Sequence, residues 1–567
     1  MSTVSTKSRA SNKKRGQTNE PRDGKGKDLP EPAPAEGIST RAWLTAAGSI
    51  LAIGAFLRLY DLPLVPLHHD EGVNGNFLVR LVREGVYQYD PANYHGPTLY
   101  YFAAIFPWTI RFLLGANAQN SYGLTTMNIR LVTALFGVGT ICLVLLLRKQ
   151  LGTIGVLSAA ALLAISPGAV YLSRYFIHES LFVFFTLGIV VAGLYFCEEG
   201  HPVYLVLLFA SAGLLFATKE TWIISAGVLI IALASTLVYR WLWSSLASGK
   251  RNEVAGNDGS STFSEWTQST IEHFGGPLTL AISVLAAIAV CIAIGVLFYS
   301  SFGTHWKGVG DSVKTFEVWT KTGQTAHVHS WWTYVTKWLV YQESPVLFLG
   351  AIGFVLILLK PRNAVALFCG LWAFGIIAAY SLVQYKTPWL LLNFIVPLAL
   401  ISGYGFEWLY QNVGKDLRLL ATIGVLVLSV SGYQMIDLNF RNYDNDNEYY
   451  VYVYAHSRRD LIKLVDDVNR IAQHSGKPAD TGITIVSPEY WPLPWYFRDY
   501  QRVGYYGRMS ASAEPVVIAS ETQRSEADAA FGSRYRLVQS GLNPRGSFAL
   551  RPGVDLLLYV RSDVPAP

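Results

Sequence analysis

Long apolar segments separated by short polar ones dominate the chain from residue 42 to residue 436. A membrane-spanning helix needs about 20 mostly apolar residues, and on that length we expect roughly eleven spans. They lie at 42–60, 127–147, 152–171, 178–197, 202–217, 222–243, 277–299, 345–360, 363–382, 388–409 and 418–436. The pattern therefore predicts a polytopic α-helical membrane domain over 42–436.

Two longer polar segments interrupt the apolar ones, at 61–126 and 300–343. The first contains amphipathic stretches at 76–86 and 98–114, which we expect to form helices lying along the membrane surface. The second is rich in Trp, His and Lys. We expect both to be loops on the outer side of the membrane.

The composition becomes that of a soluble protein from about residue 437. Residues 459–473 have helical periodicity, with apolar residues on one face. Short β-branched runs follow at 483–486, 515–519, 535–538 and 556–560. We therefore predict a small extracytoplasmic α/β or α+β domain over 437–567.

Composition agrees with a membrane protein: 51% of the 567 residues are hydrophobic and 15% are charged, against about 25% charged in a soluble protein. Much of the net charge of +6 lies in residues 1–41, a Pro-, Gly- and Lys-containing stretch that predicts a disordered basic tail. The charge therefore does not indicate nucleic-acid binding. The four cysteines lie in apolar segments, so no disulfide framework is indicated.

Basic residues in the connecting segments alternate along the chain as the positive-inside rule requires if the N-terminus is cytoplasmic. The acidic pair at Glu198 and Glu199 is the exception. With this orientation every unusual polar motif falls on the outer face, together with the C-terminal domain. We expect a multi-pass protein of the cell membrane.

The most informative motif is His68-His69-Asp70-Glu71-Gly72, directly after the first apolar segment. Charged groups at the edge of a bilayer are costly, so adjacent carboxylates there indicate function. Asp70 could take a proton from a sugar acceptor, and Glu71 could tune it or bind a metal. Equally, both could be solvated loop carboxylates or helix caps.

Histidines recur near this motif, among them His69, His95 and His178. Imidazole and carboxylate groups suit Zn²⁺ or Mn²⁺, so His69 and His178 are weak metal candidates. The sequence has no tight ligand spacing, however, and interfacial histidines in a polar cleft explain the pattern better. No cofactor is certain, and a divalent Mn²⁺ or Mg²⁺ stays open.

Three more polar groups interrupt the apolar pattern. Arg174 and Glu179 flank the fourth span, as an ion pair or as a phosphate ligand and a second active-site acid. Lys219 and Glu220 sit between two spans, as snorkelling residues or as site residues. Tyr385, Lys386 and Trp389 begin the tenth span, where the lysine suits either a lipid-linked phosphate or a lipid headgroup.

An aromatic, proline-containing stretch, Trp491-Pro492-Leu493-Pro494-Trp495-Tyr496-Phe497-Arg498-Asp499, lies in the C-terminal domain. It could stack on sugar rings or dock this domain on the membrane helices. We favour docking, because two prolines among aromatics make a rigid surface.

Taken in order, these motifs resemble the GT-C superfamily of membrane glycosyltransferases. The carrying features are His68-His69-Asp70-Glu71, Tyr94-His95-Gly96-Pro97, Ser173-Arg174 with Glu179, Ala217-Thr218-Lys219-Glu220, Tyr385-Lys386-Thr387-Pro388-Trp389 and the stretch 491–499. The resemblance is to the protein O-mannosyltransferase and aminoarabinose-transferase group (glycosyltransferase family 39-like). The chain is also similar to a prokaryotic family described as flippase activity-associated.

The resemblance implies a sugar donor carried on polyprenyl phosphate, with membrane lipid around it, and an acceptor that is a protein, a lipid or a glycan. It implies that Asp70 is the catalytic base, with Glu71 supporting it and Glu179 as a second acid. Donor-phosphate ligands would be Arg174, Lys219, Lys386 and Tyr385; pocket residues would be His69, His95, Glu220 and Trp389. The Tyr-Lys-Thr-Pro-Trp start of the tenth span departs from the Arg- and Tyr-rich aminoarabinose-transferase pattern, so the phosphate ligands carry over weakly.

The flippase-associated similarity implies a different activity, in which the protein transports a lipid-linked oligosaccharide or assists a transporter without transferring sugar. A transporter should place polar groups through the depth of the membrane. Here the spans are mostly apolar and the charges gather at one face, which favours the transferase.

Overall fold

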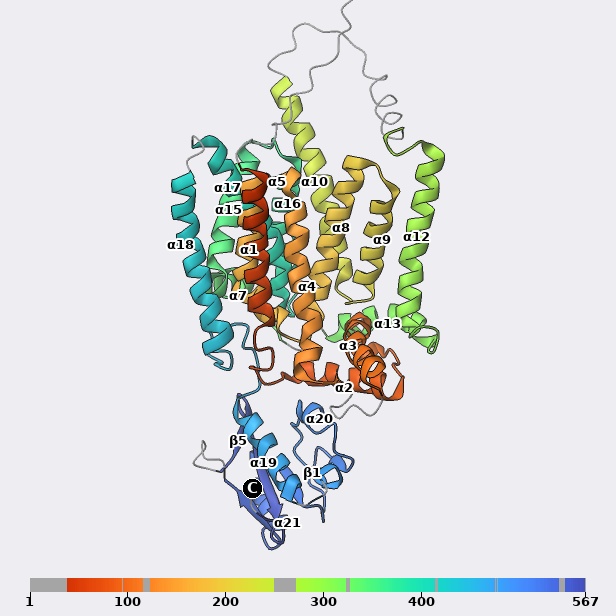
Figure 1. Ribbon diagram of the computed structural model, residues 1–567, viewed down its shortest axis with the longest axis vertical. Helices are drawn as coiled ribbons and strands as arrows, with labels where there is room; N and C mark the ends of the chain where they lie inside the picture. Colours follow the sequence, from red (N-terminus) through yellow and green to blue (C-terminus); the bar gives the residue numbers. More distant parts are fainter. Residues whose placement is uncertain are drawn as a thin grey trace, which may run out of the picture. The chain divides into compact units, whose positions relative to one another are not determined.

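The structure is a computed structural model that describes residues 38–93, 95–115, 123–248, 272–322, 327–413, 417–474, 476, 478–539 and 546–565. Apart from residues 38–41, the predicted basic tail lies outside these residues. A helix bundle forms most of the described chain, and a small sheet domain follows it (Figure 1).

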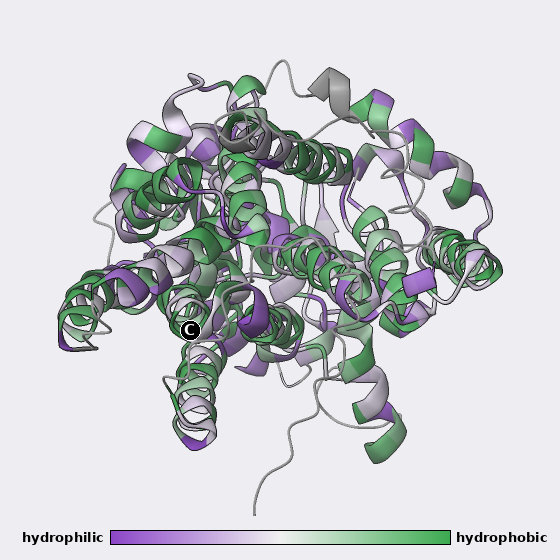
Figure 2. Cartoon of the chain, turned by 90° about the horizontal axis from the view of Figure 1, so that it is seen from above, coloured by the Kyte–Doolittle hydropathy of each residue, from purple (hydrophilic) through white to green (hydrophobic). Residues whose placement is uncertain are grey.

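Every predicted apolar segment is helical in the structure. The helices are α1 Thr40–Leu59, α4 Thr126–Leu146, α5 Arg148–Leu151, α6 Thr153–Ile165, α7 Pro167–Ser173, α8 Glu179–Glu199, α9 Pro202–Phe216, α10 Trp222–Ser248, α12 Pro277–Tyr299, α14 Val340–Gln342, α15 Ser344–Leu359, α16 Ala364–Leu382, α17 Leu392–Asn412 and α18 Leu417–Ile436. Within the described residues, 8 helices are long and apolar enough to cross a membrane, or up to 10 if each of two bent pairs counts as one span. Apolar residues run along these helices in Figure 2. The protein is thus a multi-pass membrane protein, as predicted.

Within the described residues, the structure has fewer candidate spans than the sequence predicted, because some of the apolar segments are short or bent. Helix α9 is a shorter apolar helix of 15 residues. Helices α6 and α7 meet at a 60° bend, and the Tyr334–Gln342 helix (η3, Tyr334–Leu339, with α14) meets α15 at a 118° bend. The sequence predicted α6 with α7 and α9 as one span each, and it placed Tyr334–Gln342 in the outer loop before the span at 345–360, because hydropathy does not register a bend.

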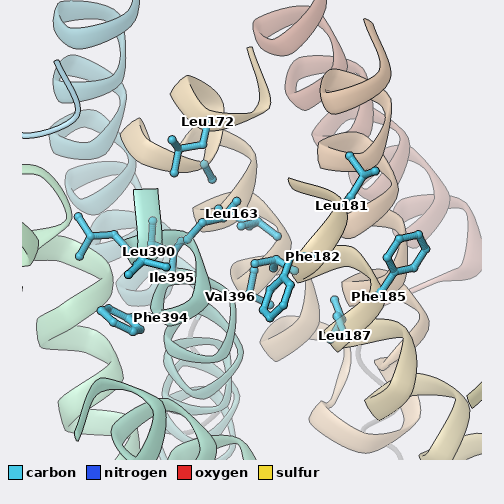
Figure 3. Packing of buried hydrophobic residues seen from close by; sticks show 14 of the residues in the cluster. Leu163, Leu172, Leu181, Phe182, Phe185, Leu187, Leu390, Phe394, Ile395 and Val396 are labelled. Atoms are coloured by element: carbon cyan, nitrogen blue, oxygen red, sulfur yellow. The ribbon is translucent and has the colours of Figure 1, made fainter. Parts of the chain in front are cut away.

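The centre of the bundle is α17, which packs against α6, α15 and α16. Glycines allow the close approach: a Cβ on Gly403 would lie 2.2 Å from the Gly155 carbonyl oxygen of α6. Small residues at helix contacts are the usual way in which membrane helices pack closely. Large apolar side chains such as Phe182 of α8 and Val396 of α17 fill the space between the helices (Figure 3).

Segment 61–126 contains two amphipathic helices, α2 His69–Glu84 and α3 Thr98–Leu114, with the short helix η1 Pro91–Asn93 between them. Helix α3 has the predicted bounds, whereas α2 begins seven residues before the stretch expected from periodicity and includes the Asp70-Glu71 motif. Segment 300–343 forms α13 Lys307–Thr322 before η3. Short helices η4 Pro388–Leu391 and η5 Asp437–Arg441 adjoin α17 and α18.

The C-terminal domain has one mixed sheet with the strand order β2-β1-β3-β6-β4, and β5 also pairs with β6. Its elements are α19 Asp460–His474, η6 Pro478–Asp480, β1 Ile483–Ile485, α20 Leu493–Tyr496, β2 Val503–Tyr505, β3 Val516–Ser520, η7 Glu521–Gln523, α21 Arg524–Phe531, β4 Tyr535–Val538, β5 Phe548–Arg551 and β6 Val554–Arg561. Strands β1 and β2, and β1 and β3, are parallel, while β6 is antiparallel to its neighbours. The four predicted strands and the predicted helix are present; β2 and β5 were missed.

The boundary between the two domains differs from the predicted one at residue 437. Val451, Tyr452 and Val453 are buried in the core of the membrane domain. The apolar core of the sheet domain begins with Leu461 on α19. The chain after the last span therefore folds back on the membrane helices before the soluble domain starts.

Candidate active site

A cavity of about 360 Å³ lies where α2, η1, the α9–α10 connection and the start of η4 converge. Eight of the predicted site residues line it: His69, Asp70, His95, Glu179, Lys219, Glu220, Tyr385 and Trp389. These come from segments far apart in the sequence, so the structure brings together most of the motifs that the sequence placed on one membrane face.

Asp70 lies in the first turn of α2, and its side chain is 42% exposed. Its backbone N–H donates to Nδ1 of His68 at 3.0 Å, so the other ring nitrogen of His68 donates to the Tyr454 carbonyl at 3.1 Å. His68 thus caps the helix, and the Asp70 carboxylate points into the cavity without a hydrogen bond that would occupy both oxygens.

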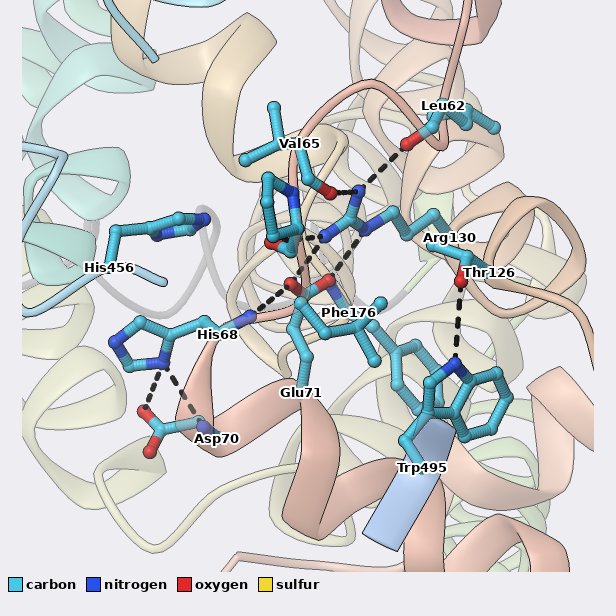
Figure 4. A network of polar contacts seen from close by, with 12 residues as sticks. Leu62, Val65, His68, Asp70, Glu71, Thr126, Arg130, Phe176, His456 and Trp495 are labelled. Atoms are coloured by element: carbon cyan, nitrogen blue, oxygen red, sulfur yellow. Dashed lines mark hydrogen bonds and ion pairs between the residues drawn. The ribbon is translucent and has the colours of Figure 1, made fainter. Parts of the chain in front are cut away.

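Glu71 has a different environment, although it is the next residue. Its side chain is fully buried and forms a double ion pair with Arg130 of α4, at 2.7 Å from Nε and 2.6 Å from Nη2 (Figure 4). It also accepts hydrogen bonds from the N–H groups of His68 and Phe176, at 3.0 and 2.7 Å. Glu71 is therefore part of a helix cap and an ion pair, and it does not line the cavity.

Arg130 completes this network from the other side. It donates to the carbonyl oxygens of Leu62 and Val65 at 2.7 and 2.8 Å, and to Pro66 at 3.4 Å. Sequence reasoning missed Arg130. An arginine inside a predicted apolar span was the available signal, because a charge there needs a partner.

The Glu179 carboxylate accepts from the Lys219 ammonium at 2.5 Å, and both groups are buried. Glu220 accepts from the His95 ring at 2.9 Å, and its side chain is 2% exposed. Burial would lower the pKa of Lys219, but the carboxylates of Glu179 and Glu220 outweigh it and raise the pKa above its usual value. Burial would likewise raise the pKa of Glu220, but His95 and Lys219 lower it. This wall of the cavity therefore holds fixed charges.

Two of the predicted phosphate ligands do not line the cavity. The Arg174 guanidinium donates to the carbonyl oxygens of Leu57, Tyr60 and Asp61, at the exit of α1. Lys386 is fully buried, and its ammonium donates to the carbonyls of Ser381 and Val383 at the C-terminus of α16. Both cations satisfy backbone carbonyls that have no helical partner, which is a structural role.

The neighbours of Lys386 do reach the cavity. Tyr385 and Thr387 line it, and the backbone of this segment pairs with the 327–329 segment, through Lys386 N–H to His327 O at 3.0 Å. The Thr387 hydroxyl is buried and has no hydrogen-bond partner among the residues that the structure describes. Buried hydroxyls are nearly always paired, so this hydroxyl lacks the partner that such groups usually have.

The metal candidates are not brought together. His178 is buried, and its Nε2 is 3.0 Å from the Gly96 carbonyl oxygen, while His69 lines the cavity. In the described part of the chain, no group of three or more His, Cys, Asp or Glu side chains is arranged to hold a metal ion.

The C-terminal domain docks on the membrane domain through the aromatic stretch, as predicted. The N–H of Leu67, just before α2, donates to the Tyr496 hydroxyl at 2.9 Å, and the Trp495 ring donates to Thr126 at 3.3 Å. At the N-terminus of α2, the Arg551 guanidinium lies 3.4 Å from Nδ1 of His69. Burial lowers the pKa of His69, and Arg551 adds to this against the opposing charge of Asp70.

The comparisons with known proteins agree with the resemblance at the level of the fold of a polytopic membrane protein. Residues 104–249 match the sequence profile of the family described as Dolichyl-phosphate-mannose-protein mannosyltransferase. No curated protein sequence matches the chain.

Solved structures of other membrane proteins resemble this structure over nearly the whole chain. ArnT from Cupriavidus metallidurans in the apo state is 14% identical, with a TM-score of 0.56 over 91% of this chain and 98% of that one. The structure of the same protein bound to undecaprenyl phosphate is also 14% identical, with a TM-score of 0.55 over 93% of this chain and 100% of that one. The archaeal oligosaccharyltransferase AglB from Archaeoglobus fulgidus is more distant, with 13% identity and a TM-score of 0.49 over 92% and 75%. At these identities the ArnT likeness shows the shared fold.

Proposed function

We propose that the protein is an inverting membrane glycosyltransferase that moves a sugar from a polyprenyl-phosphate donor to an acceptor hydroxyl, with Asp70 as the base. The observation that carries the proposal is the difference in environment between Asp70 and Glu71. Asp70 is exposed in the cavity, whereas the oxygens of Glu71 are taken up by Arg130 and two backbone N–H groups. A base must reach the proton that it removes.

In the proposed reaction, Asp70 accepts the proton of the acceptor hydroxyl, whose oxygen attacks C1 of the donor sugar. The bond between C1 and the phosphate oxygen breaks, and polyprenyl phosphate leaves with the bonding electrons. The Lys219 ammonium, the one Lys or Arg cation among the described residues that line the cavity, stabilises the charge that develops on the phosphate. Glu179 holds this ammonium in place.

The donor class is supported by two of the comparisons. The matched family is described by dolichyl-phosphate mannose, and one of the similar structures contains undecaprenyl phosphate. We therefore choose polyprenyl-phosphate mannose as the first donor to test. The alternation of basic residues supports an active site on the outer face of the cell membrane, with the N-terminus in the cytoplasm.

The position of the buried charges favours transfer over transport of a lipid-linked oligosaccharide. Within the described membrane helices, the buried charged side chains lie near helix ends, such as Arg58 of α1, Arg130 of α4 and Glu407 of α17. A transporter for a polar headgroup needs polar groups through the membrane depth. The cavity at one end of the bundle suits an enzyme that works at a single face.

The test compares the wild type with Asp70→Asn in lipid, by the release of free polyprenyl phosphate from labelled polyprenyl-phosphate mannose. Loss of a general base lowers the rate by about 10²–10⁴-fold. Glu448→Gln is the control, because this carboxylate is 86% exposed and does not line the cavity. Equal release from the wild type and Asp70→Asn would refute the assignment of Asp70.

A further inference from the structure

A second hollow of about 380 Å³ lies beside the active-site cavity, between the 86–93 segment and the start of α13. The two hollows share Phe77 and Asn93 in their walls. The short helix η1, Pro91–Asn93, separates them as a single turn, and its residues face one hollow or both. The hollows are therefore neighbours across a thin wall.

One face of α2 runs along both hollows. Asp70, Val73, Asn74 and Phe77 line the first, and Phe77 and Arg80 line the second. This spacing of three, four, seven and ten residues is a single stripe of an α-helix. At a rise of about 1.5 Å per residue, the stripe from Asp70 to Arg80 is about 15 Å long. This stripe of α2 borders both hollows, with the proposed base at one end, and the two hollows together are called the groove below.

The far end of the groove offers hydrogen-bond donors and acceptors side by side. Arg80 and Lys307 are exposed cations, with 54% and 75% of their side chains accessible. Asp90 and Gln88 supply acceptor groups, and the Tyr87 and Tyr89 rings border the same hollow. Hydroxyl groups both donate and accept, so such a lining suits a polyhydroxylated ligand.

The backbone around the groove argues against a peptide as its ligand. The described residues that line the second hollow belong to helices and connecting segments, with no β-strand among them. One mode of peptide binding adds an extended peptide to a strand edge, with pockets for alternate side chains. No strand edge of that kind borders the second hollow among the residues that the structure describes.

We propose that the groove binds an extended polyhydroxylated acceptor, a glycan chain, with its reacting hydroxyl at Asp70 and its next sugar units at Arg80 and Lys307. This inference rests on the proposed transferase function and adds the substrate class of its acceptor site. The glycan could be free or carried on a lipid, since the groove would contact only the sugar units.

The experiment measures KM and kcat of the full-length protein in lipid, with polyprenyl-phosphate mannose as donor. Acceptors are mannose, mannotetraose and a lipid-linked mannotetraose, and a serine-containing peptide is the competitor class. Loss of one charged hydrogen bond weakens binding by about tenfold. Arg80→Gln and Lys307→Gln should therefore raise KM for both tetrasaccharides by about that factor, and for mannose by less than about twofold. A lower KM for the lipid-linked form identifies the lipid-borne source.

Lys314→Gln is the matched control. Lys314 and Lys307 are both on α13, both are exposed, and both pair with Asp311, at 2.9 and 3.8 Å. Only Lys307 of these two lines the groove, so Lys314→Gln should keep the wild-type KM for every acceptor. Equal effects of the two lysine variants, or transfer to the peptide in preference to mannotetraose, would overturn the proposal.

Donor cleavage separates this inference from the proposed function. If polyprenyl phosphate is released in an Asp70-dependent way but mannotetraose is no better than mannose, the groove proposal alone fails. If no Asp70-dependent release occurs, the transferase function itself fails, and the groove proposal with it.

Discussion

Glu71 and Arg130 form a buried double ion pair that joins the first turn of α2 to α4, with Asp70 directly beside it on the cavity side. The pair fixes the direction in which α2 leaves the membrane bundle. Because Asp70 is the preceding residue, its carboxylate is held by a rigid turn rather than by a loop. A network whose donors and acceptors are all used positions a neighbouring group precisely enough for chemistry.

Removing one partner of this pair should lower the free energy of unfolding without any direct effect on Asp70. Breaking a buried pair leaves an unpaired charge and costs about 3–5 kcal/mol. We expect Glu71→Gln and Arg130→Gln to lower the midpoint of thermal unfolding in detergent strongly, whereas Asp70→Asn shifts it little. The double variant Glu71→Gln with Arg130→Met should regain part of the loss, since no charge remains unpaired.

A wild-type melting curve for Glu71→Gln would contradict this structural role. So would a variant that keeps its stability but loses donor cleavage as completely as Asp70→Asn, because Glu71 would then act in the reaction itself.

Helix α2 shows which part of the fold could be predicted from the sequence and which could not. Periodicity located an amphipathic helix at 76–86, and the acidic motif was recognised separately, but the two are one helix from His69 to Glu84. Its faces serve three partners: the cavity, the bundle through Glu71, and the C-terminal domain through Gly72 and Gly75. A helix that is buried on several sides has no clean two-faced pattern, so its start was not visible from periodicity.

The candidate site shows the same limit. Residue type and position identified Asp70, Glu179 and Lys219, which do line one cavity. Lys386 was chosen because a lysine at a span start suits a phosphate, but its ammonium binds carbonyls at the end of α16. The sequence shows that a side chain is charged. It does not show which backbone carbonyls lie close enough to bind that charge, because this depends on the folded structure.

The contact between α2 and the C-terminal domain depends on a glycine. A Cβ at position 72 would lie 2.5 Å from Pro492 Cβ and 2.8 Å from Pro492 Cα. We expect Gly72→Ala to push α20 away from α2, at a cost of about 1–3 kcal/mol. Limited proteolysis should then release the C-terminal domain faster than in the wild type.

Gly48→Ala is the control for this substitution. Gly48 is also inside a helix, but a Cβ there would meet no atom within 4 Å. Alanine in place of glycine in a helix interior is neutral or mildly favourable. Equal digestion of the two variants would show that the contact at Gly72 does not hold the domains together.

One carboxylate joins two bent helix pairs. Glu343 lies at the 118° bend before α15, and it accepts from Ser166 Oγ at 3.0 Å and from the Gly168 N–H at 2.7 Å, at the 60° bend between α6 and α7. Glu343→Ala leaves this buried N–H unpaired, so we expect a loss of about 1–3 kcal/mol in the free energy of unfolding. Thermal unfolding in detergent measures it.

The conservative change Glu343→Gln should cost less, because an amide oxygen can still accept from Gly168. Glu448→Ala, which removes an 86% exposed carboxylate, serves as the control and should melt as the wild type does. A Glu343→Ala protein of wild-type stability would mean that the two bends do not depend on this residue.

We expect His456 to make the stability of the fold depend on pH. It is buried between the Tyr171 and Tyr175 rings, and its Nδ1 is 3.2 Å from the Tyr171 hydroxyl. Burial, reinforced by the nearby His68 and Arg130, holds the pKa of His456 well below its usual value of 6.5. In the unfolded chain the ring takes up a proton near the usual value, whereas in the folded protein it stays neutral.

The unfolded state therefore binds more protons as the pH falls below about 6.5, and the free energy of unfolding decreases there by up to about 1.4 kcal/mol per pH unit. We expect the melting temperature of the wild type to drop between pH 7.5 and pH 5, and His456→Gln to make this drop smaller. His474→Gln, at the exposed end of α19, should keep the wild-type slope. If His456→Gln keeps the full slope instead, the acid sensitivity comes from other groups, and His456 is protonated without penalty in the folded protein.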